Sequence, residues 1–181
     1  MRRHNYNDLA FSLYDFLNLE ECVQLIKQAE EIGFDVALVN DGNEQSKRTD
    51  VRNNQRIIFD DPDLAMKFWV KFSAKEKIIL DDWEPIGFNE RFRFYKYDQY
   101  QTFKWHRDMP YKRSENIQSQ YTFMIYLNSD FSGGFTDFED FKIWPETGMA
   151  AIFYHKLRHE GSVVSDGTKY VLRTDIMFQR K

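Results

Sequence analysis

Two residues that commonly bind metals stand one position apart near the middle of the chain. In the segment KWHRDMP, residues 104–110, His106 and Asp108 flank a single arginine. In an extended segment, residues i and i+2 point to the same side, so one imidazole nitrogen and one carboxylate oxygen can face one ion. The same three letters occur in the catalytic loop of protein kinases, and a His-x-Asp pair is also common on ordinary protein surfaces.

The kinase interpretation fails on the surrounding sequence. A kinase catalytic loop has an asparagine five residues after its aspartate, and this chain has Arg113 at that position. The sequence contains no glycine-rich phosphate loop, and 181 residues are few for a kinase. The metal site and the ordinary surface pair are the alternatives that remain.

A metal site needs a third ligand, and the chain has four histidines to supply one: His4, His106, His155 and His159. His159 lies far enough downstream of Asp108 for several strands to intervene and bring the two segments together. Two histidines and one carboxylate, with three positions open, form the facial triad of non-haem Fe(II) oxygenases. His155 is a rival third ligand, and its other interpretation is a buried histidine that supports the site.

The elements that would position these residues divide the chain into two parts. Apolar residues at helical spacing predict a helix over 19–32, capped by Asn18 and ended by Gly33, and a second helix from Pro62 with Asp61 as its cap. FDVALV (34–39) predicts a strand, and the polar residues 40–55 predict an exposed loop. After Asn89 the period changes to two, which predicts strands in ERFRFYKY, SQYTFMIYLN, MAAIFYH and KYVLRTDIMF. Two helices before a run of strands indicate an α+β chain with helices packed on one face of a β structure.

Each of these strands has one apolar face and one face that mixes charged and phenolic groups, because alternate side chains lie on opposite sides. Tyrosines with a free hydroxyl suit a cleft better than open solvent, so converging polar faces predict a polar-lined barrel interior. The polar faces comprise Arg91, Arg93, Tyr95, Tyr97, Thr122, Met124, Tyr126, Lys169, Val171, Arg173 and Asp175.

Composition excludes several classes of protein. Hydrophobic residues make up 42% of the chain, which suits one globular domain and is too much for disorder. No apolar run approaches the roughly 20 residues of a membrane span, and no secretion signal is recognisable. A net charge of -4 without a basic block argues against a nucleic-acid partner. Cys22 is the only cysteine, so no internal disulfide can form and a cytoplasmic location is expected.

The ordered motifs between about Arg91 and Phe178 resemble a known family. After the His106-Arg-Asp108 motif come YTFMIYLN, FSGGFTDF, PETGMAAIF and HEGSVVSDGTKYVLRTD. Together they resemble the prolyl 4-hydroxylase-like branch of the Fe(II)/2-oxoglutarate oxygenases. The resemblance implies a double-stranded β-helix, a jelly roll related to the cupins, with the N-terminal helices packed on one sheet. It implies a single oxygenase domain over 1–181, with helical support over about 1–88 and a catalytic core over about 89–181.

The resemblance also implies roles for particular residues. His106, Asp108 and His159 would hold the iron. Lys169, ten positions after His159 and preceded by a Gly-x pair, would bind the far carboxylate of 2-oxoglutarate, because a dianion in a closed pocket needs a paired cation. Tyr126, just before Leu-Asn on a central strand, and Tyr97 would assist in binding 2-oxoglutarate.

Two positions depart from the family pattern or carry alternatives. The usual glycine before the H-x-D motif is Tyr100 here, so that loop is expected to differ in conformation. Arg173 is a second cation on the Lys169 face of its strand. It would contact 2-oxoglutarate or a substrate carboxylate, or else form a structural ion pair with Asp175 or another acid.

The implied reaction is oxidative decarboxylation of 2-oxoglutarate to succinate and CO₂, coupled by Fe(II) and O₂ to hydroxylation of a C–H bond, with ascorbate as a candidate reductant. Related halogenases lack the carboxylate ligand, so Asp108 favours hydroxylation. The alternative is a metal-binding scaffold without turnover. The candidate substrates are a peptidyl proline, a free amino acid and another small molecule. Candidate substrate contacts are the loop 40–55 and the residues Arg91, Arg93 and Tyr95, each of which could equally be a solvated surface position.

Overall fold

The computed structural model describes residues 1–37, 39–41, 44–46 and 51–181. Two helices occur in these residues, α1 (Leu19–Ile32) and α2 (Pro62–Ser73). The strands before the H-x-D motif are β1 (Arg2–Asn7), β2 (Ala10–Tyr14), β3 (Asp35–Val36), β4 (Val39–Asp41), β5 (Glu44–Ser46), β6 (Gln55–Asp60), β7 (Trp83–Phe88), β8 (Arg91–Tyr97) and β9 (Phe103–His106). The later strands are β10 (Lys112–Ser114), β11 (Ile117–Tyr126), β12 (Ser132–Gly133), β13 (Thr136–Phe138), β14 (Lys142–Ile143), β15 (Ala150–Tyr154), β16 (His159–Gly161), β17 (Val164–Asp166) and β18 (Lys169–Arg180).

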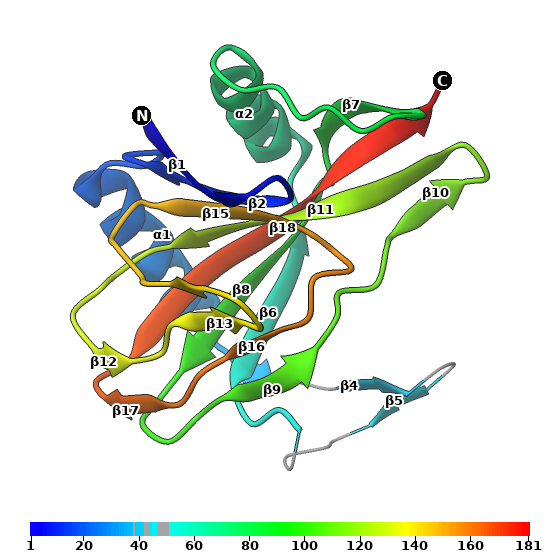
Figure 1. The fold of residues 1–181 in the computed structure, drawn as a ribbon. Helices are drawn as coiled ribbons and strands as arrows, with labels where there is room; N and C mark the ends of the chain where they lie inside the picture. The colour runs from blue at the N-terminus through cyan, green and yellow to red at the C-terminus, as the bar shows by residue number, and fades with distance from the viewer. Residues whose placement is uncertain (38, 42–43, 47–50) are drawn as a thin grey trace.

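Two antiparallel sheets face each other to form the jelly roll (Figure 1). The larger sheet has ten strands in the order β1-β2-β15-β11-β18-β8-β6-β3, with β10 beside β11 and β7 beside β18. The smaller sheet has four strands in the order β14-β13-β16-β9. Strands from distant parts of the chain are therefore neighbours, and the predicted double-stranded β-helix is confirmed.

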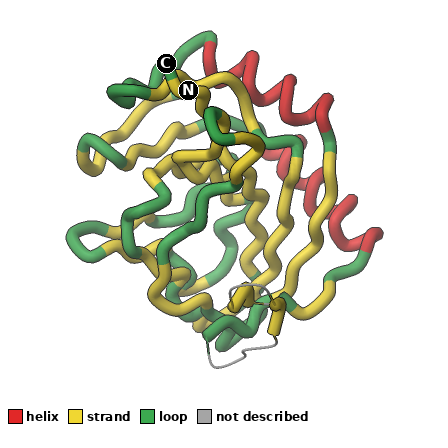
Figure 2. The backbone as a smooth tube through the Cα atoms, turned by 90° about the vertical axis from the view of Figure 1, so that its right-hand side faces the viewer, coloured by secondary structure: helices red, strands yellow, loops and turns green. Residues whose placement is uncertain are grey.

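The two helices cover the outer face of the large sheet, along one side of the molecule (Figure 2). Asn18 caps α1 through a reciprocal pair of hydrogen bonds with Glu21, and the Asp61 side chain accepts a hydrogen bond from the Leu64 amide at the start of α2. Both caps agree with the sequence prediction. Buried residues of α1 and α2 join the apolar face of β8, β11 and β18 in one aromatic-rich core that includes Phe68, Phe72, Phe92, Phe94, Phe123, Leu172 and Phe178.

The opposite faces of the same strands point into the barrel, as alternation predicted. Tyr95, Tyr97, Met124, Tyr126 and Val171 belong to a second buried cluster between the two sheets. Register keeps these residues in rows across the sheet, since Lys169 is the partner of Tyr97 and Val171 is the partner of both Tyr95 and Tyr126. One face of the large sheet therefore supports the fold, and the other lines the interior.

The N-terminal part of the chain contains more strands than the sequence indicated. Two strands that the sequence did not indicate, β1 and β2, lie before α1 and extend the large sheet beyond β15. Within the strand predicted over 34–39, β3 covers Asp35–Val36 and β4 begins at Val39, with 38 outside the described residues. The expected loop contains the β4–β5 hairpin, with 42–43 and 47–50 outside the described residues. Among the described helices, neither has the length and apolar character needed to cross a membrane.

Candidate metal centre

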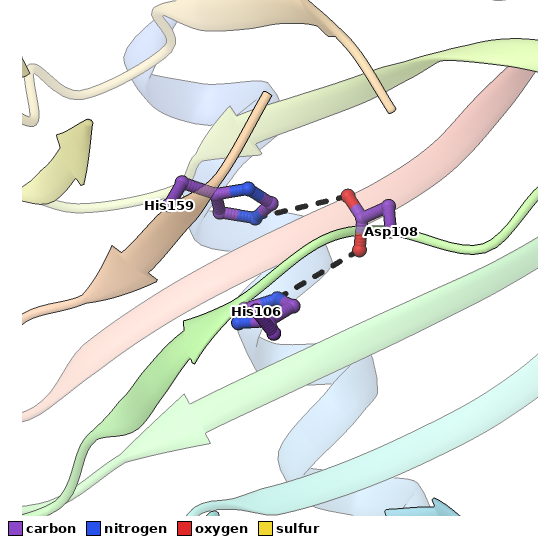
Figure 3. A group of neighbouring side chains, drawn as sticks. All are labelled: His106, Asp108 and His159. Carbon is purple, nitrogen blue, oxygen red and sulfur yellow. Dashed lines mark ion pairs between the residues drawn. The ribbon is translucent and has the colours of Figure 1, made fainter. Parts of the chain in front are cut away.

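Three potential metal ligands come together inside the barrel from two strands and the loop that follows one of them. His106 ends β9, Asp108 lies two residues later, and His159 begins β16 directly opposite His106 in the register of the small sheet. One ligand atom from each residue lies within 4.8 Å of the others. The Nε2 atoms of His106 and His159 are each 3.8 Å from a carboxylate oxygen of Asp108 (Figure 3).

Backbone carbonyl groups orient both imidazole rings. Nδ1 of His106 lies 2.7 Å from the Lys104 carbonyl oxygen, and Nδ1 of His159 lies 3.0 Å from that of Leu157. A carbonyl oxygen can only accept, so each Nδ1 carries the proton and each Nε2 keeps its lone pair. Each lone pair is thus available for a metal, with the ring held by a partner of the kind that supports histidine ligands elsewhere.

The Asp108 carboxylate is held through one of its two oxygens. Its Oδ2 accepts a hydrogen bond from the Thr122 hydroxyl at 2.5 Å and forms an ion pair with Arg173 Nη2 at 3.1 Å. Burial is the largest influence and would raise the pKa of this carboxyl, but Arg173 and the neighbouring histidines together outweigh burial and hold the pKa below its usual range. Asp108 is therefore an anion, and its Oδ1 accepts no hydrogen bond from the described residues.

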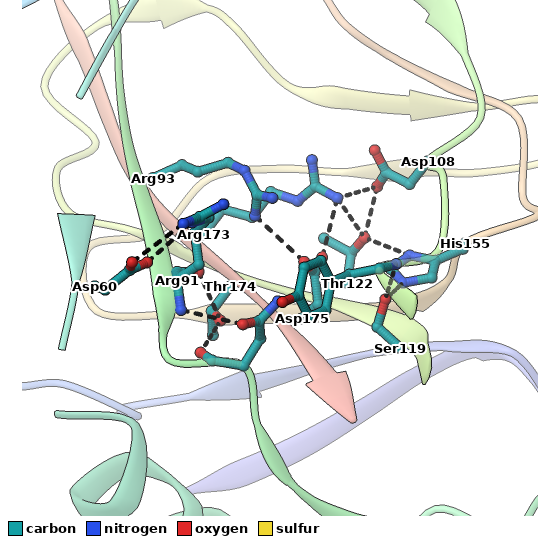
Figure 4. A network of polar contacts seen from close by, with 12 residues as sticks. Asp60, Arg91, Arg93, Asp108, Ser119, Thr122, His155, Arg173, Thr174 and Asp175 are labelled. Atoms are coloured by element: carbon teal, nitrogen blue, oxygen red, sulfur yellow. Dashed lines mark hydrogen bonds and ion pairs between the residues drawn. The ribbon is translucent and has the colours of Figure 1, made fainter. Parts of the chain in front are cut away.

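His155 belongs to the support of Asp108 rather than to the ligand group. Its Nδ1 lies 3.1 Å from the Thr122 hydroxyl and its Nε2 lies 2.9 Å from the Ser119 hydroxyl, in the network of Figure 4. The Thr122 hydroxyl donates to Asp108, so Nδ1 of His155 must donate to Thr122. In addition, the His155 carbonyl accepts a hydrogen bond from the Asp108 amide at 3.1 Å. Both contacts fix the position of the carboxylate.

Burial keeps the two ligand histidines neutral. It lowers the pKa of His106 to about 3, with a smaller contribution from the neighbouring His159, and it also lowers the pKa of His159. Metals bind neutral imidazole, so the protonation state at neutral pH already suits coordination. Two neutral nitrogens and one carboxylate match the donor set of a non-haem Fe(II) site.

A buried lysine lies further along the interior. Lys169 begins β18 and is 3% exposed. Its ammonium donates a hydrogen bond to the Gly134 carbonyl and lies about 5 Å from the ring centres of Tyr97 and Tyr126, at 5.2 and 5.3 Å. No carboxylate of the described residues forms an ion pair with it, and burial lowers its pKa to about 7. A cation in this position suits an anionic ligand.

The two tyrosines predicted beside Lys169 are also buried. The Tyr126 hydroxyl lies 2.6 Å from the Thr136 hydroxyl, and Tyr97 is the register partner of Lys169. Tyr100, which stands where the family has glycine, has a positive φ of 67°. The loop before the H-x-D motif thus adopts the left-handed backbone that glycine favours, although a tyrosine occupies the position.

Arg173 lies beside the metal ligands and not beside Lys169. Besides Asp108, its Nη2 contacts Asp175 Oδ1 at 3.1 Å and the Thr122 hydroxyl at 3.3 Å. Burial would lower its pKa, but the charges of Asp108 and Asp175 outweigh burial and raise it. Of the alternatives drawn from the sequence, the structure shows the ion pair with Asp175.

The candidate substrate contacts separate into inner and outer positions. Tyr95 is buried and lines the same pocket as His106 and Asp108. Arg93 pairs with Asp175 at 3.2 Å, at the edge of that network. Arg91 forms a two-pronged ion pair with Asp60 at 2.9 and 3.1 Å on the exposed rim, away from the pocket lining.

Several residues of the site were not singled out in the sequence. Thr122 was placed only on the polar face of its strand, and its bond to Asp108 depends on packing between the loop and β11. Arg52, whose guanidinium carbon lies 4.6 Å from the Tyr95 ring centre, comes from a polar stretch with no pattern that marks it. Position on a polar face was the one available signal for Thr122, and Arg52 was included only as part of the candidate loop 40–55.

Comparison with known proteins agrees with this geometry. Residues 92–174, which include all three metal-ligand candidates and Lys169, match the model of the 2OG-Fe(II) oxygenase superfamily. Over this stretch, slightly under half of the chain, the sequence is that of the 2OG-Fe(II) oxygenase superfamily. A search of curated protein sequences gives no match.

Solved structures of prolyl hydroxylases share the fold of this oxygenase. A viral collagen prolyl hydroxylase from Paramecium bursaria Chlorella virus-1, in its 2OG complex, is 22% identical, with 93% of this chain and 96% of that chain covered and a TM-score of 0.65. A prolyl-4-hydroxylase from Pseudomonas putida is 15% identical, with 95% and 92% covered and a TM-score of 0.66. A Trichoplax adhaerens prolyl hydroxylase, in complex with a hypoxia inducible factor peptide fragment, is 15% identical, with 94% and 84% covered and a TM-score of 0.71. At these identities the similarity establishes the fold.

The predictions of family, fold, enzyme class and cofactors are thereby confirmed. The protein is a 2-oxoglutarate-dependent dioxygenase that uses Fe(II), 2-oxoglutarate and O₂. Its own residues fit these groups, since two free Nε2 atoms and a carboxylate converge on one point, and beyond them lies a buried cation that has no acidic partner in the described part of the chain.

Proposed function

We propose that the enzyme hydroxylates a C–H bond of its substrate, with His106, Asp108 and His159 holding the iron and Lys169 holding the far carboxylate of 2-oxoglutarate. The observation that carries this assignment is the pairing of a three-residue ligand group with a buried lysine that lacks an acidic partner among the described residues. Iron and 2-oxoglutarate together supply the oxidation: O₂ and 2-oxoglutarate become succinate and CO₂, and one oxygen atom enters the substrate as a hydroxyl group.

The protein itself fixes the metal ligands in place and limits how many of its own atoms bind the metal. Thr122 and Arg173 occupy Oδ2 of Asp108, which leaves Oδ1 as the oxygen offered to the metal. A carboxylate that binds through one oxygen keeps three positions open for the cosubstrate and O₂. Retention of this carboxylate also supports hydroxylation over halogenation, because Asp108 fills the coordination position that a halide takes in the related halogenases.

The aromatic lining supports the second half of the assignment. Tyr97 and Tyr126 surround the Lys169 ammonium and exclude water from it, so a carboxylate arriving there gains a charge-assisted hydrogen bond in a low-dielectric setting. Burial raises the pKa of Tyr97 to about 12 and that of Tyr126 also, so both are neutral donors at neutral pH.

The wider context of the reaction rests on the same proposal. We infer a single oxygenase domain over 1–181, in which the region before residue 89 supplies both helices and several strands of the large sheet. The named similarity to prolyl hydroxylases makes a peptide substrate one option beside a free amino acid and another small molecule. The absence of a nucleic-acid or membrane partner and a cytoplasmic location stay predictions, drawn from charge, hydropathy and the lone cysteine.

The proposal is tested by measuring succinate release from 2-oxoglutarate in air, with Fe(II) and a panel of peptides and amino acids, followed by mass spectrometry of each candidate product. We expect Fe(II)-dependent succinate that a chelator abolishes, and a gain of one oxygen atom in the accepted substrate. A protein that binds Fe(II) and 2-oxoglutarate but releases no succinate under any condition would indicate the scaffold instead.

A further inference from the structure

Four arginines gather beside Tyr95 at the inner face of the large sheet. Arg56 is the register partner of Tyr95, and Arg93, two residues before Tyr95 on β8, is the partner of Arg173. Register partners lie side by side on one face of a sheet, so three strands deliver guanidinium groups to the same region. Arg52 adds a fourth, with its guanidinium carbon 4.6 Å from the Tyr95 ring centre.

The acids of this region account for only part of that positive charge. Asp175 binds Arg93 and Arg173, and Asp108 binds Arg173 and faces the metal site. Arg52 is 5% exposed, and its one side-chain hydrogen bond within the described residues is from Nε to the neutral Asn54 amide, at 2.6 Å. Its Nη2 is buried and has no acceptor among the residues that the structure describes.

Arg56 is in a similar position. Half-buried, it forms no side-chain hydrogen bond or ion pair with any residue that the structure describes. Burial lowers its pKa, and the charges of Arg52 and Arg93 add to that effect although Tyr95 opposes it. A buried guanidinium such as that of Arg52, with no counter-charge among the described residues, is costly, so Arg52 with Arg56 on the same side of Tyr95 favours the arrival of an anion.

Arg52 lies next to the metal ligands and apart from the lysine. The Arg52 guanidinium carbon is 4.4 Å from the Phe103 ring centre, and Phe103 stacks on His106 with 3.6 Å between ring centres. Tyr95 and Phe103 line the pocket that contains the ligand group. Lys169 sits instead among Tyr97, Tyr126 and the Gly134 carbonyl, so it can serve 2-oxoglutarate while the arginines serve another molecule.

We propose that the substrate carries an oxyanion, a carboxylate or a phosphate monoester, which Arg52 and Arg56 bind while the C–H bond to be oxidised faces the metal. Guanidinium groups present paired N–H donors that match the oxygens of both anions. This inference rests on the proposed function and narrows its substrate: a neutral peptidyl proline does not satisfy the site unless an acidic group lies close to it.

Binding of simple anions tests the site without knowledge of the substrate. The full chain is loaded with Mn(II) and saturating 2-oxoglutarate, so that the metal and Lys169 sites are filled and no turnover occurs. Sodium acetate and inorganic phosphate are then titrated at constant ionic strength, with calorimetry and thermal unfolding as readouts. Acetate stands for a carboxylate substrate and phosphate for a phosphate ester, so the tighter anion identifies the group.

The expected result is saturable binding of at least one anion, with a dissociation constant that rises roughly 10- to 150-fold in Arg52→Gln and in Arg56→Gln. Binding of 2-oxoglutarate stays unchanged in both variants, which also shows that they fold. Arg56 is only half-buried, so its variant carries the test if Arg52→Gln does not fold. Arg113→Gln removes a charge from an exposed ion pair with Glu90 and is the matched control.

Two outcomes contradict different proposals. If 2-oxoglutarate binds to the wild type but neither anion does, or if the anions bind equally to wild type, Arg52→Gln and Arg56→Gln, the oxyanion site is wrong and the proposed function stands. If 2-oxoglutarate itself does not bind in the presence of metal, the proposed function is wrong.

Discussion

Two buried cations on one face of β18 have opposite surroundings, and this difference separates their roles. Arg173 has two carboxylate partners, Asp108 and Asp175, each at 3.1 Å. Lys169 has a backbone carbonyl and two aromatic rings, and no acid among the described residues. The charge of Arg173 is already matched within the protein, whereas that of Lys169 is available to a ligand.

Replacing these two cations is expected to give distinct defects. Lys169→Ala removes one charge-assisted contact, worth about 1.5–3 kcal/mol, and should raise the dissociation constant of 2-oxoglutarate roughly 10- to 150-fold with metal affinity retained. Arg173→Ala leaves Asp108 buried without its cation, while Asp175 keeps Arg93, so it should lower stability by about 3–5 kcal/mol and weaken metal binding. Anaerobic titrations with Fe(II) and 2-oxoglutarate measure both. Loss of 2-oxoglutarate binding in Arg173→Ala alone would reverse the roles.

The pH dependence of 2-oxoglutarate binding follows from the same lysine. Burial lowers the pKa of Lys169 to about 7, so above that pH the folded protein without ligand holds a neutral amine, and binding the dianion must restore the proton. The affinity for 2-oxoglutarate should therefore be full below pH 7. Above pH 7 it should decrease, approaching a tenfold loss for each further pH unit.

Calorimetry in two buffers of different ionisation enthalpy detects the proton taken up on binding at pH 8. In Lys169→Arg the side chain stays charged, so this variant should bind 2-oxoglutarate without proton uptake and with a flatter pH profile. The stability of the ligand-free protein changes with pH in the opposite direction. The cost of burying the charged lysine is present below pH 7 and is relieved as pH rises towards the unfolded pKa near 10.4. Identical proton uptake in wild type and Lys169→Arg would contradict the assignment.

At the scale of elements, β11 serves the core and the site with alternate residues. Thr122 and Tyr126 face the interior of the barrel, while Phe123 faces the helices. The Phe123 ring centre lies 4.5–6.5 Å from four other rings, those of Phe16, Phe68, Phe72 and Phe88. A single strand thus links the packing of α2 to the placement of the residue that supports Asp108.

Truncation of the central aromatic should affect the fold and spare the chemistry. Phe123→Ala should lower the free energy of unfolding by about 3–5 kcal/mol, because it opens a cavity among fully buried rings. Affinity for 2-oxoglutarate, measured well below the unfolding temperature, should stay within twofold of wild type. Phe34→Ala removes a half-buried ring near Tyr170 and should cost much less, which makes it the control. A Phe123→Ala protein with wild-type stability would disprove the central place of this ring in the core.

At the scale of the whole molecule, the site joins the two sheets. Two of the candidate ligands come from the small sheet through β9 and β16, whereas Thr122, Lys169 and Tyr126 come from the large sheet. A metal with 2-oxoglutarate would span the space between them. Ligands that bind only the folded state stabilise it, so occupancy of the site should appear as resistance to unfolding.

Mn(II) with 2-oxoglutarate at about 100 times the dissociation constant should add about 2.7 kcal/mol of stability, or roughly 5–11 °C in the unfolding temperature. A chelator should reverse the shift. His159→Ala should lose it, and His155→Ala should keep a metal-dependent shift although it starts from a lower temperature, because His155 supports Asp108 through Thr122. Differential scanning calorimetry of the two variants measures the shift in unfolding temperature and so decides which histidine is the third ligand. A shift that survives in His159→Ala and disappears in His155→Ala would make His155 the third ligand.

Local patterns in the sequence determined much of the fold and the identity of the site candidates. The caps at Asn18 and Asp61 and the alternation along β8, β11 and β18 depend on residues a few positions apart, so they can be read without knowledge of the fold. The H-x-D pair and the spacing from His159 to Lys169 are equally local signals. For this reason the polar faces, both boundaries of α1 and the start of α2 were predicted correctly.

Only the tertiary structure decided which of these residues meet. Opposition of His106 and His159 is a consequence of register between β9 and β16, and the approach of Arg52 to Phe103 depends on an isolated bridge between distant segments. The strand β3 has only two residues and β1 (RRHNYN) is polar along its whole length, so neither shows a recognisable period, and their pairing emerges from the sheet that receives them. The partners of Arg173, His155 and Arg52 follow from barrel closure, because a sequence specifies which face a side chain occupies but not which distant strand packs against it.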